Sequence, residues 1–539
     1  MNEYAVPPVM NLARLLTHTA QLFPNHIGLI QGDAQYTWKQ IDARVNVMVN
    51  ALRALGVRKG DKILLLSRNN LSVFESCWTA FRLGCVWVPT NFRLTPPEVA
   101  YLAESSGAVA MMVEPHFAEH TVAVRAASSS LKHVISIGSA GLHELSYETL
   151  IEQGLAHPQA VFEETVGYSD PLWYFYTSGT TGRPKAAVLT HGQMAFVVTN
   201  HLADLIPGTC ETDCSIAVAP LSHGAGIHAL LNVARGATTV LLPSEKLDPE
   251  VFWQLVSKHR VSNLFTVPTI LKMLVEHPAV DDHDRSSIRF VIYAGAPMYR
   301  ADQKRALQKL GKVLVQYFGL GEVTGCITVL PPSMHCADDN DSNANIGSCG
   351  RPRTGMEVAI LDADLQPVEA GMVGEICCRG PAVFAGYYNN PEATEKAMRG
   401  GWFHTGDLGR VDERGLLYIT GRESDMYISG GSNVYPREVE EVLLSHPAIA
   451  EVAVLGMPDE KWGEIGVAIV VLRASMKTGA GLTQADVLAH LEGRCARYRH
   501  PRHVFFWTEL PKSGYGKITK KDLKRLLIER GEMPQLTIL

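Results

Sequence analysis

A run of hydroxylated residues and glycines between positions 176 and 185 has the composition of a phosphate-binding loop. Its glycines allow backbone N–H groups to converge on an anion, its hydroxyl groups add donors, and its last residue adds a positive charge. It is not a Walker A loop, because Arg183-Pro184 separates the second glycine from the lysine. The alternative interpretation is a flexible surface turn. The residues expected to contact phosphate are Thr177, Ser178, Gly179, Thr180, Thr181, Gly182 and Lys185.

Two further glycine-containing segments follow along the chain. In segment 219–226, His223 stands between a serine and a glycine and could face a carboxylate, although a packed loop histidine is the alternative. Segment 293–297 follows the apolar run 289–292, and ligands of α/β proteins bind at the carboxyl ends of such strands. A plain Gly-Pro turn is the alternative for this second segment.

Segments 402–408 and 419–425 flank a predicted hairpin that can bring Asp407 and Arg422 together at its base. A carboxylate acceptor beside a forked guanidinium donor can bind the two hydroxyl groups of a ribose. A surface ion pair is the alternative. The sequence therefore indicates a nucleotide site, with the hairpin on one side and the phosphate loop on the other.

Taken in order, these segments resemble the motifs of the AMP-forming adenylating superfamily, over nearly the whole chain. That superfamily contains acyl-CoA synthetases, aryl-CoA ligases, nonribosomal adenylation domains and luciferases. The resemblance implies that ATP activates a carboxylic acid as an acyl-adenylate with release of pyrophosphate, and that the acyl group then passes to the thiol of coenzyme A. It also implies Mg²⁺ as the metal ion.

The resemblance assigns roles to individual residues. It implies that Glu322 reaches Mg²⁺, that His223 lies near the acyl pocket, and that Lys517 enters the active site for the first half-reaction. The loop at residues 429–431 is expected to turn toward the pantetheine channel, which adds Ser429, Gly430 and Gly431. The residues expected around the nucleoside are Gly295, Ala296, Pro297, Phe318, Gly319, Asp407, Ile419 and Arg422.

Three positions depart from the family pattern. Phe318 replaces a tyrosine, Gly321 replaces the threonine that usually bonds the nucleotide phosphate, and Ser424 stands where the family has an aspartate or lysine hinge. A lost donor at Gly321 predicts a substitute hydroxyl or water, or slower adenylation. Two alternatives stay open: a ligase that loads a carrier protein, and a nucleotide-binding homologue with impaired catalysis.

Alternating β-rich and amphipathic stretches predict an α/β fold. From about residue 345 the strands are punctuated by glycine, and the last ~115 residues predict helix, strand, helix, strand and a basic helix from about Lys520. We therefore expect a large N-terminal domain of α/β layers with a β-rich subdomain at 1–422, and a small mobile α+β domain at 423–539 that carries Lys517.

Composition restricts the partners. The 539 residues carry a net charge of -6, which offers no basic field for nucleic acid. The first residues do not form a targeting segment, and no apolar stretch approaches the ~20 residues of a membrane helix, so we expect a cytoplasmic protein without an integral membrane segment. A homodimer is compatible with these features.

The residues of the expected acyl pocket indicate the general class of the acid but not which acid it is. We expect residues 223–227, Gly295, Gly319 and 323–326 to line it, and they are small and apolar without an evident fixed cation. Such a lining favours a monocarboxylic acid with an aliphatic or aryl body over a dicarboxylate or an amino acid.

Overall fold

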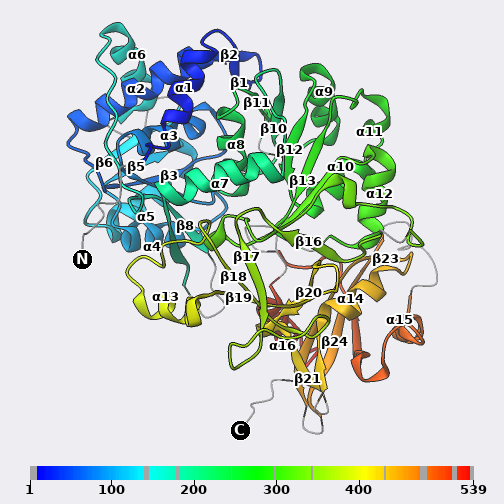
Figure 1. Cartoon of the computed structure of the whole chain (residues 1–539). Coiled ribbons are helices and arrows are strands. Elements are labelled where there is room, and N and C mark those ends of the chain that lie inside the picture. The colour runs from blue at the N-terminus through cyan, green and yellow to red at the C-terminus, as the bar shows by residue number, and fades with distance from the viewer. Residues whose placement is uncertain are drawn as a thin grey trace.

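The computed structural model describes residues 9–138, 145–177, 183–244, 246–296, 298–341, 344–429, 432–459, 462–473, 482–512 and 519–534. Within these ranges the chain forms three β-sheets with helices packed around them (Figure 1). Two large sheets are built before residue 423, and a smaller sheet is built after residue 426. This architecture confirms the expected combination of a large α/β part and a smaller C-terminal α+β part.

The first sheet has seven strands in the order β7-β6-β5-β3-β4-β8-β9, and only β8 and β9 are antiparallel. The predicted phosphate loop therefore connects β8 to the antiparallel edge strand β9. The strands are β3 (Lys62–Leu66), β4 (Val86–Pro89), β5 (Ala110–Val113), β6 (His133–Ser136), β7 (Leu145–Ser146), β8 (Pro171–Thr177) and β9 (Lys185–Thr190). The helices of this part are α2 (Trp38–Ala54), α3 (Leu71–Arg82), α4 (Pro96–Ser106), α5 (Ala118–Ala127) and α6 (Tyr147–Ala156).

The second sheet has 13 strands in the order β17-β18-β19-β20-β16-β15-β14-β13-β12-β10-β11-β1-β2. Its strands are β1 (Ile27–Gln31), β2 (Ala34–Thr37), β10 (Cys214–Ala217), β11 (Thr238–Leu241), β12 (Asn263–Thr266), β13 (Phe290–Tyr293), β14 (Leu314–Phe318), β15 (Thr328–Leu330), β16 (Ser348–Pro352), β17 (Glu357–Leu361), β18 (Gly374–Arg379), β19 (Phe403–Val411) and β20 (Leu417–Arg422). The β-rich subdomain is thus continuous with the α/β sheet, because β16 pairs with both β15 and β20.

The helices of this second part connect and cover its strands. They are α1 (Arg14–Leu22), α7 (His191–Asp204), α8 (Gly224–Val233), α9 (Pro249–His259), α10 (Pro268–Glu276), α11 (Ala279–Asp282), α12 (Arg300–Leu310) and α13 (Pro391–Ala397). Helices α7 and α8 contact each other, and α8 also contacts β10, β11 and β12. The amino end of α8 lies against β12, because a Cβ atom on Gly224 would be 2.7 Å from Phe265 Cζ.

The C-terminal sheet has the order β22-β21-β24-β23, with β25 paired to β24. Its strands are β21 (Tyr427–Ser429), β22 (Ser432–Val434), β23 (Ile449–Asp459), β24 (Gly463–Leu472) and β25 (His503–Phe506), and its helices are α14 (Pro436–Leu444), α15 (Gln484–Leu491) and α16 (Lys520–Glu529). The basic helix begins at Lys520 as predicted. The predicted order was wrong in omitting the β21–β22 hairpin and in placing one strand where β23 and β24 form an antiparallel pair.

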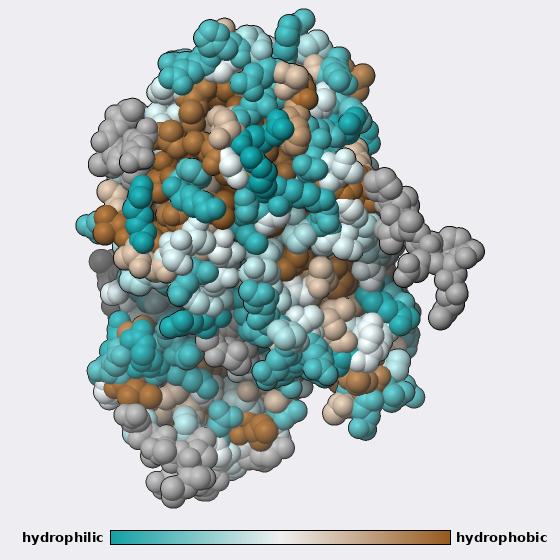
Figure 2. All heavy atoms as spheres, turned by 90° about the vertical axis from the view of Figure 1, so that its left-hand side faces the viewer, coloured by the Kyte–Doolittle hydropathy of each residue, from teal (hydrophilic) through white to brown (hydrophobic). Residues whose placement is uncertain are grey.

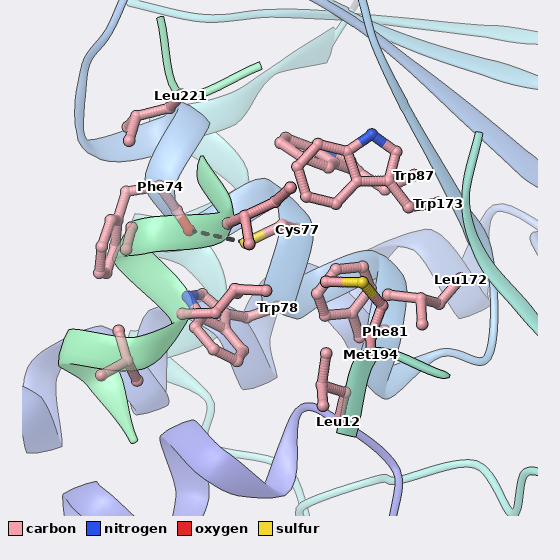
Figure 3. Close-up of a cluster of buried hydrophobic side chains, with 14 of the residues drawn as sticks. Leu12, Phe74, Cys77, Trp78, Phe81, Trp87, Leu172, Trp173, Met194 and Leu221 are labelled. Atoms are coloured by element: carbon pink, nitrogen blue, oxygen red, sulfur yellow. Dashed lines mark hydrogen bonds between the residues drawn. The ribbon is translucent and has the colours of Figure 1, made fainter. Parts of the chain in front are cut away.

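An aromatic cluster holds α3 against the first sheet (Figure 3). Trp87 of β4 and Trp173 of β8 meet edge to face with ring centroids 4.5 Å apart, and Phe81 of α3 lies 6.5 Å from Trp87 in the same arrangement. Edge-to-face contact is a preferred geometry for aromatic rings. Trp173 lies four residues before Thr177, so this packing fixes the strand that ends at the predicted phosphate loop.

The distribution of polar and apolar side chains on the surface is that expected from the composition. Figure 2 shows hydrophilic side chains over much of one face, with apolar residues between them in its upper part. Well-exposed apolar side chains belong to several elements, for example Leu22 of α1, Val122 of α5 and Leu155 of α6, and such exposure is ordinary.

All ten cysteines are free. None of the helices described is long and apolar enough to cross a membrane.

Buried histidines should make the stability of this protein depend on pH. Burial lowers the pKa of His191, His228 and His335 from the ordinary 6.5 to about 4. Between these two values the unfolded chain binds more protons than the folded chain, so stability decreases as the pH falls from 6.5 toward 4. The loss is about 1.4 kcal/mol per pH unit for each proton.

Thermal midpoints measured from pH 7 down to pH 4.5 test this dependence. His335→Gln removes one titrating group and should flatten the decrease, whereas His116→Gln, at an exposed position, should leave it unchanged. A decrease of the same steepness in both variants would contradict the assignment.

Candidate active site

Glu322 is the centre of a cluster of polar side chains at the end of β8. The cluster forms because Glu322 lies in the turn after β14, and because its backbone oxygen accepts a hydrogen bond from Phe384 N at 2.8 Å. This bond holds the segment that carries Tyr387. The Thr177 hydroxyl and the Tyr387 phenol each donate to Glu322 Oε1 at 2.9 Å.

The second carboxylate oxygen of Glu322 makes no hydrogen bond to any residue that the structure describes. The side chain is nevertheless only 5% exposed. Burial and the neighbouring Glu322 charge together raise the pKa of Tyr387 above its ordinary value, so the phenol stays protonated as a donor. A carboxylate held by two donors on one oxygen can offer the other to a hard cation.

Lys185 belongs to the same cluster. It is the first residue of β9 and pairs with Thr177 across the β8–β9 ladder. Its ammonium nitrogen lies 5.2 Å from the centre of the Tyr387 ring, which is within the range of a cation–π contact. Among the described residues it forms no ion pair, so its charge is available to an anionic ligand.

Packing explains why a glycine stands at position 321, and the sequence did not reveal this reason. A Cβ atom at this position would lie 2.6 Å from Phe175 Cδ1 and 2.9 Å from Thr177 Cγ2, both far below van der Waals contact. The ring of Phe175 therefore occupies the space that a threonine would need. Thr177 adjoins position 321, and its hydroxyl donates to Glu322 Oε1, so it is a candidate for the hydroxyl that Gly321 lacks.

We expect Gly321→Thr to destabilise the protein and displace Thr177, because overpacking a filled site costs about 1–3 kcal/mol. Its melting temperature and its rate of pyrophosphate release should both fall. Adding Phe175→Leu makes room and should recover much of both losses. A single Gly321→Thr variant that matches the parent in melting temperature and rate would contradict this explanation.

The hairpin of β19 and β20 places Asp407 opposite Arg422, as the sequence predicted. Arg422 Nε donates to Asp407 Oδ1 at 3.1 Å, and the two side chains are 44% and 9% exposed. The guanidinium thus reaches the surface while the carboxylate lies at the base of the hairpin. Ribose binding by this pair stays a prediction, and the observed geometry is compatible with it.

The predicted nucleoside residues that the structure describes lie on or next to strands of the second sheet. Phe318 ends β14 and Ile419 lies in β20, and both pack against one small apolar cluster of Ile360, Ile376 and Leu417. Gly295 and Ala296 follow β13 and are exposed. The carbonyl oxygen of Ile419 accepts a hydrogen bond from Arg437 Nη1 of α14 at 3.2 Å, which ties the C-terminal part to this strand.

His223 is the residue before the first turn of α8. Its ring centroid is 4.9 Å from that of Phe175, the residue that also packs against Gly321. Ser429 ends β21, and Gly319 directly follows β14. The other predicted residues lie outside the described ranges: Ser178, Gly179, Thr180, Thr181, Gly182, Pro297, Gly430, Gly431 and Lys517.

Another group with metal-ligating atoms is Glu375, Cys377 and His404, whose ligand atoms lie within 4.8 Å of one another. His404 Nδ1 is 2.6 Å from Glu375 Oε2, and the guanidinium of Arg399 lies 3.0 Å from the same nitrogen. A positive charge at that distance opposes a metal cation. We therefore interpret this group as a polar network that is buried at His404 and exposed at Arg399.

Sequence reasoning missed Tyr387 and Phe175. Tyr387 lies in the run 384–388, where a phenylalanine and two tyrosines surround a glycine; that aromatic enrichment was the available signal. Phe175 lies inside the apolar run of β8 and gave no signal, because only the packing against Gly321 shows its importance.

Known proteins are similar to this chain in sequence and in fold. The family model "AMP-binding enzyme" matches residues 16–388, and "AMP-binding enzyme C-terminal domain" matches residues 438–517. A feruloyl-CoA synthase from Amycolatopsis sp is 35% identical, over 94% of this chain and 97% of that protein. An indoleacetate–CoA ligase from Aromatoleum aromaticum is 33% identical, over 98% and 100%. The crystal structure of the anthranilate CoA ligase AuaEII with anthranoyl-AMP superimposes with a TM-score of 0.87 at 26% identity, covering 99% and 100%.

The chain that brings Thr177, Lys185 and Glu322 together is thus similar in sequence and fold to CoA ligases, one of them solved with an acyl-adenylate bound. The chain belongs to the AMP-binding enzyme family, and within that family it is an ATP-dependent acid–CoA ligase. This result confirms the resemblance inferred from the sequence motifs and the expected use of ATP and coenzyme A.

Proposed function

We propose that this enzyme activates an aryl or aliphatic monocarboxylic acid as its acyl-adenylate, using ATP and Mg²⁺, and then forms the acyl-CoA thioester. The observation that carries the proposal is the cluster of Glu322, Thr177, Lys185 and Tyr387 beside the predicted phosphate loop. It combines one buried carboxylate with one ammonium group at the place where a triphosphate would enter.

In the first step, a carboxylate oxygen of the acid attacks the α-phosphorus of ATP. A bond forms between that oxygen and phosphorus, the bond to the pyrophosphate oxygen breaks, and pyrophosphate leaves with the electron pair. Both reactants are negatively charged, so Lys185 and Lys517 are proposed to lower their repulsion and stabilise the charge on the phosphate oxygens. Thr177 and the residues 178–182 are proposed to donate hydrogen bonds to the phosphates.

The residues around Glu322 fit a magnesium ion. The oxygen that accepts no described hydrogen bond provides a hard, anionic ligand, and the Thr177 hydroxyl donates to the other oxygen of the same carboxylate. When bound there, Mg²⁺ would supply charge neutralisation and orientation of the phosphate oxygens. The chain's own contribution is to hold the Glu322 carboxylate in one position through the donors Thr177 and Tyr387.

The remaining predicted residues are proposed to bind the nucleoside and the thiol. Asp407 and Arg422 bind the ribose hydroxyls, while Phe318, with Gly319 and Ile419 beside it, supports the adenine near residues 295–297. In the second step the thiol attacks the carbonyl carbon and AMP leaves. For this step the part beyond residue 422 is proposed to turn about residues 422–424, bringing residues 429–431 toward the pantetheine of CoA, with His223 beside the acyl group.

The proposal specifies the reaction, but it gives the acid only as a broad class, aryl or aliphatic. Relatives at 33–35% identity are a feruloyl-CoA synthase and an indoleacetate–CoA ligase, and another at 33% is a long-chain-fatty-acid–CoA ligase from Mycobacterium tuberculosis. These names span aryl and alkyl acids at similar identity. They support a monocarboxylic acid without deciding between the two bodies.

Pyrophosphate release from ATP and Mg²⁺ over a panel of aryl and aliphatic acids, with and without CoA, tests the proposal. We expect one class of acid to drive release and its CoA thioester to accumulate only when CoA is present. Release of pyrophosphate with one acid but no thioester would instead indicate transfer to a carrier protein. The proposal fails if no acid of either class stimulates release from an enzyme that still binds ATP.

A further inference from the structure

Two arginines of the C-terminal part reach across to the large N-terminal part. Arg437 of α14 is half-buried, and its Nη1 donates to the carbonyl oxygen of Ile419 in β20 at 3.2 Å. Arg473, which follows β24, lies 4.0 Å from Glu276 Oε1 at the end of α10, and such a wide, partly exposed ion pair contributes little. The Arg437 contact is therefore the stronger of the two. It also joins α14 to a strand that is proposed to support the adenine.

Tyr299 makes a contact across the same boundary in the opposite direction. It is the residue before α12 in the large part, and it packs against the apolar cluster of the C-terminal part, whose buried members include Tyr427 of β21 and Val439 of α14. Burial raises the pKa of its phenol far above the ordinary value, and two carboxylates of α14 reinforce the rise. Separation of the two parts would expose this ring to water, so its burial opposes separation.

Charged groups of α14 lie against the start of α12. Burial raises the pKa of the Glu441 carboxyl group, and the nearby charges of Glu440 and Asp302 reinforce this rise. The charge of Arg437 and the backbone N–H of Arg300 oppose it. Because α12 begins at Arg300, Glu441 faces the positive amino end of that helix, where the preceding residue provides no side-chain cap. Glu441 thus stabilises α12 across the boundary in this orientation.

The observed orientation is not the one proposed for thioester formation. Ser429, the residue of the predicted pantetheine loop that the structure describes, ends β21. In Figure 1, β21 lies at the far end of the C-terminal part, remote from β8 and from the Glu322 cluster at the end of that strand. Residues 422–424 are exposed, so few contacts oppose a turn at this connection. For the loop to approach the acyl group, the contacts of α14 with the large part have to break.

We infer that Tyr299 and Arg437 are positioning residues that hold the C-terminal part in the orientation of the first half-reaction and delay its turn toward the second. This inference rests on the proposed function, which requires both orientations, and it adds the residues that set their balance. Contacts that exist in only one of two orientations lower the free energy of that orientation alone. Removing them should therefore shift the population toward the orientation of thioester formation.

Arg437→Met and Tyr299→Ala test the inference in single-turnover measurements of the two half-reactions. The acid is the one that the parent activates fastest in the aryl and aliphatic panel, for example cinnamate or hexanoate, used with ATP and then as its supplied adenylate with CoA. The rate of thioester formation divided by the rate of adenylation follows the ratio of the two orientations, whichever of them predominates. We expect Arg437→Met to raise this quotient about 3- to 10-fold, the factor that one hydrogen bond typically contributes to an equilibrium. Tyr299→Ala should raise it at least as much.

Thioester formation should be no slower in these variants than in the parent, and this distinguishes a shift in orientation from damage to the fold, which would slow both half-reactions. Arg494→Met is the matched control. Arg494 is exposed, and its Nη1 donates to the carbonyl oxygen of His490 in α15 at 2.6 Å, within the C-terminal part. Its replacement removes the same charge and should leave the quotient unchanged.

The possible outcomes separate this inference from the proposed function. A quotient within twofold of the parent's in either variant, or thioester formation slower than the parent's, would overturn the inference. Acid-dependent pyrophosphate release by the parent would then still support the proposed function. A parent enzyme that adenylates no acid of the panel would instead refute the proposed function, and this inference with it.

Discussion

Replacing Glu322 with glutamine is expected to lower the rate of acyl-adenylate formation by about 10²–10³-fold, the typical cost of removing one preorganised electrostatic group. The amide keeps an oxygen for the hydrogen bonds from Thr177 and Tyr387, so the packing is preserved and the main loss is the negative charge. The concentration of Mg²⁺ at half-maximal rate should rise in the same variant. Pyrophosphate release measured over a range of Mg²⁺ concentrations reports both effects.

A matched control distinguishes this effect from a general change in charge. Glu357 forms an exposed ion pair with Arg379 on the β17–β18 pair at one edge of the second sheet, whereas β8 belongs to the first sheet. Glu357→Gln removes the same charge and should leave both the rate and the Mg²⁺ requirement unchanged. If Glu322→Gln kept its rate within threefold at every Mg²⁺ concentration, Glu322 would have no part in binding the metal ion.

The second large effect concerns Lys517. We expect Lys517→Ala to slow the first half-reaction by about 10²–10³-fold, because a positive charge that offsets the developing charge on the phosphate oxygens is lost. Thioester formation from a supplied acyl-adenylate and CoA should proceed at close to the parent rate. Single-turnover measurements of the two half-reactions, started from acid plus ATP and from the acyl-adenylate respectively, separate these rates.

Lys512→Ala serves as the control for this experiment. Lys512 belongs to the same lysine-containing segment but forms a surface ion pair with Glu451 at 2.9 Å. Its removal should leave both half-reactions unchanged. Equal losses in the two half-reactions of Lys517→Ala would contradict a role confined to adenylation and would point to a defect in folding or in CoA binding.

Local sequence patterns predicted the parts of the site that depend on short-range geometry. The spacing of Asp407 and Arg422 on either side of a hairpin was sufficient to place them opposite each other, because antiparallel register follows from the turn. The run of hydroxylated residues and glycines at 176–185 begins in β8 and ends in β9. The basic helix predicted from about Lys520 is likewise present as α16.

Features that depend on contacts between distant segments could not be predicted in this way. Phe175 and Gly321 are far apart in the chain, and only their packing explains why a glycine stands at 321. Arg353 sits in a loop whose composition resembles an ordinary polar turn, and its burial against Asp204 results from the pairing of β16 with β15 and β20. The strands β21 and β22 have three residues each, which is too short for a periodic pattern.

The central claim is that the acid is activated through an acyl-adenylate, and oxygen labelling tests it most directly. The enzyme is incubated with ATP, Mg²⁺, CoA and a carboxylic acid that carries ¹⁸O in both carboxylate oxygens, and the nucleotide products are examined by mass spectrometry. Attack of the carboxylate on the α-phosphorus predicts one ¹⁸O atom in each AMP formed, together with equal amounts of pyrophosphate and acyl-CoA. Formation of ADP with labelled inorganic phosphate, or of AMP without the label, would contradict the mechanism.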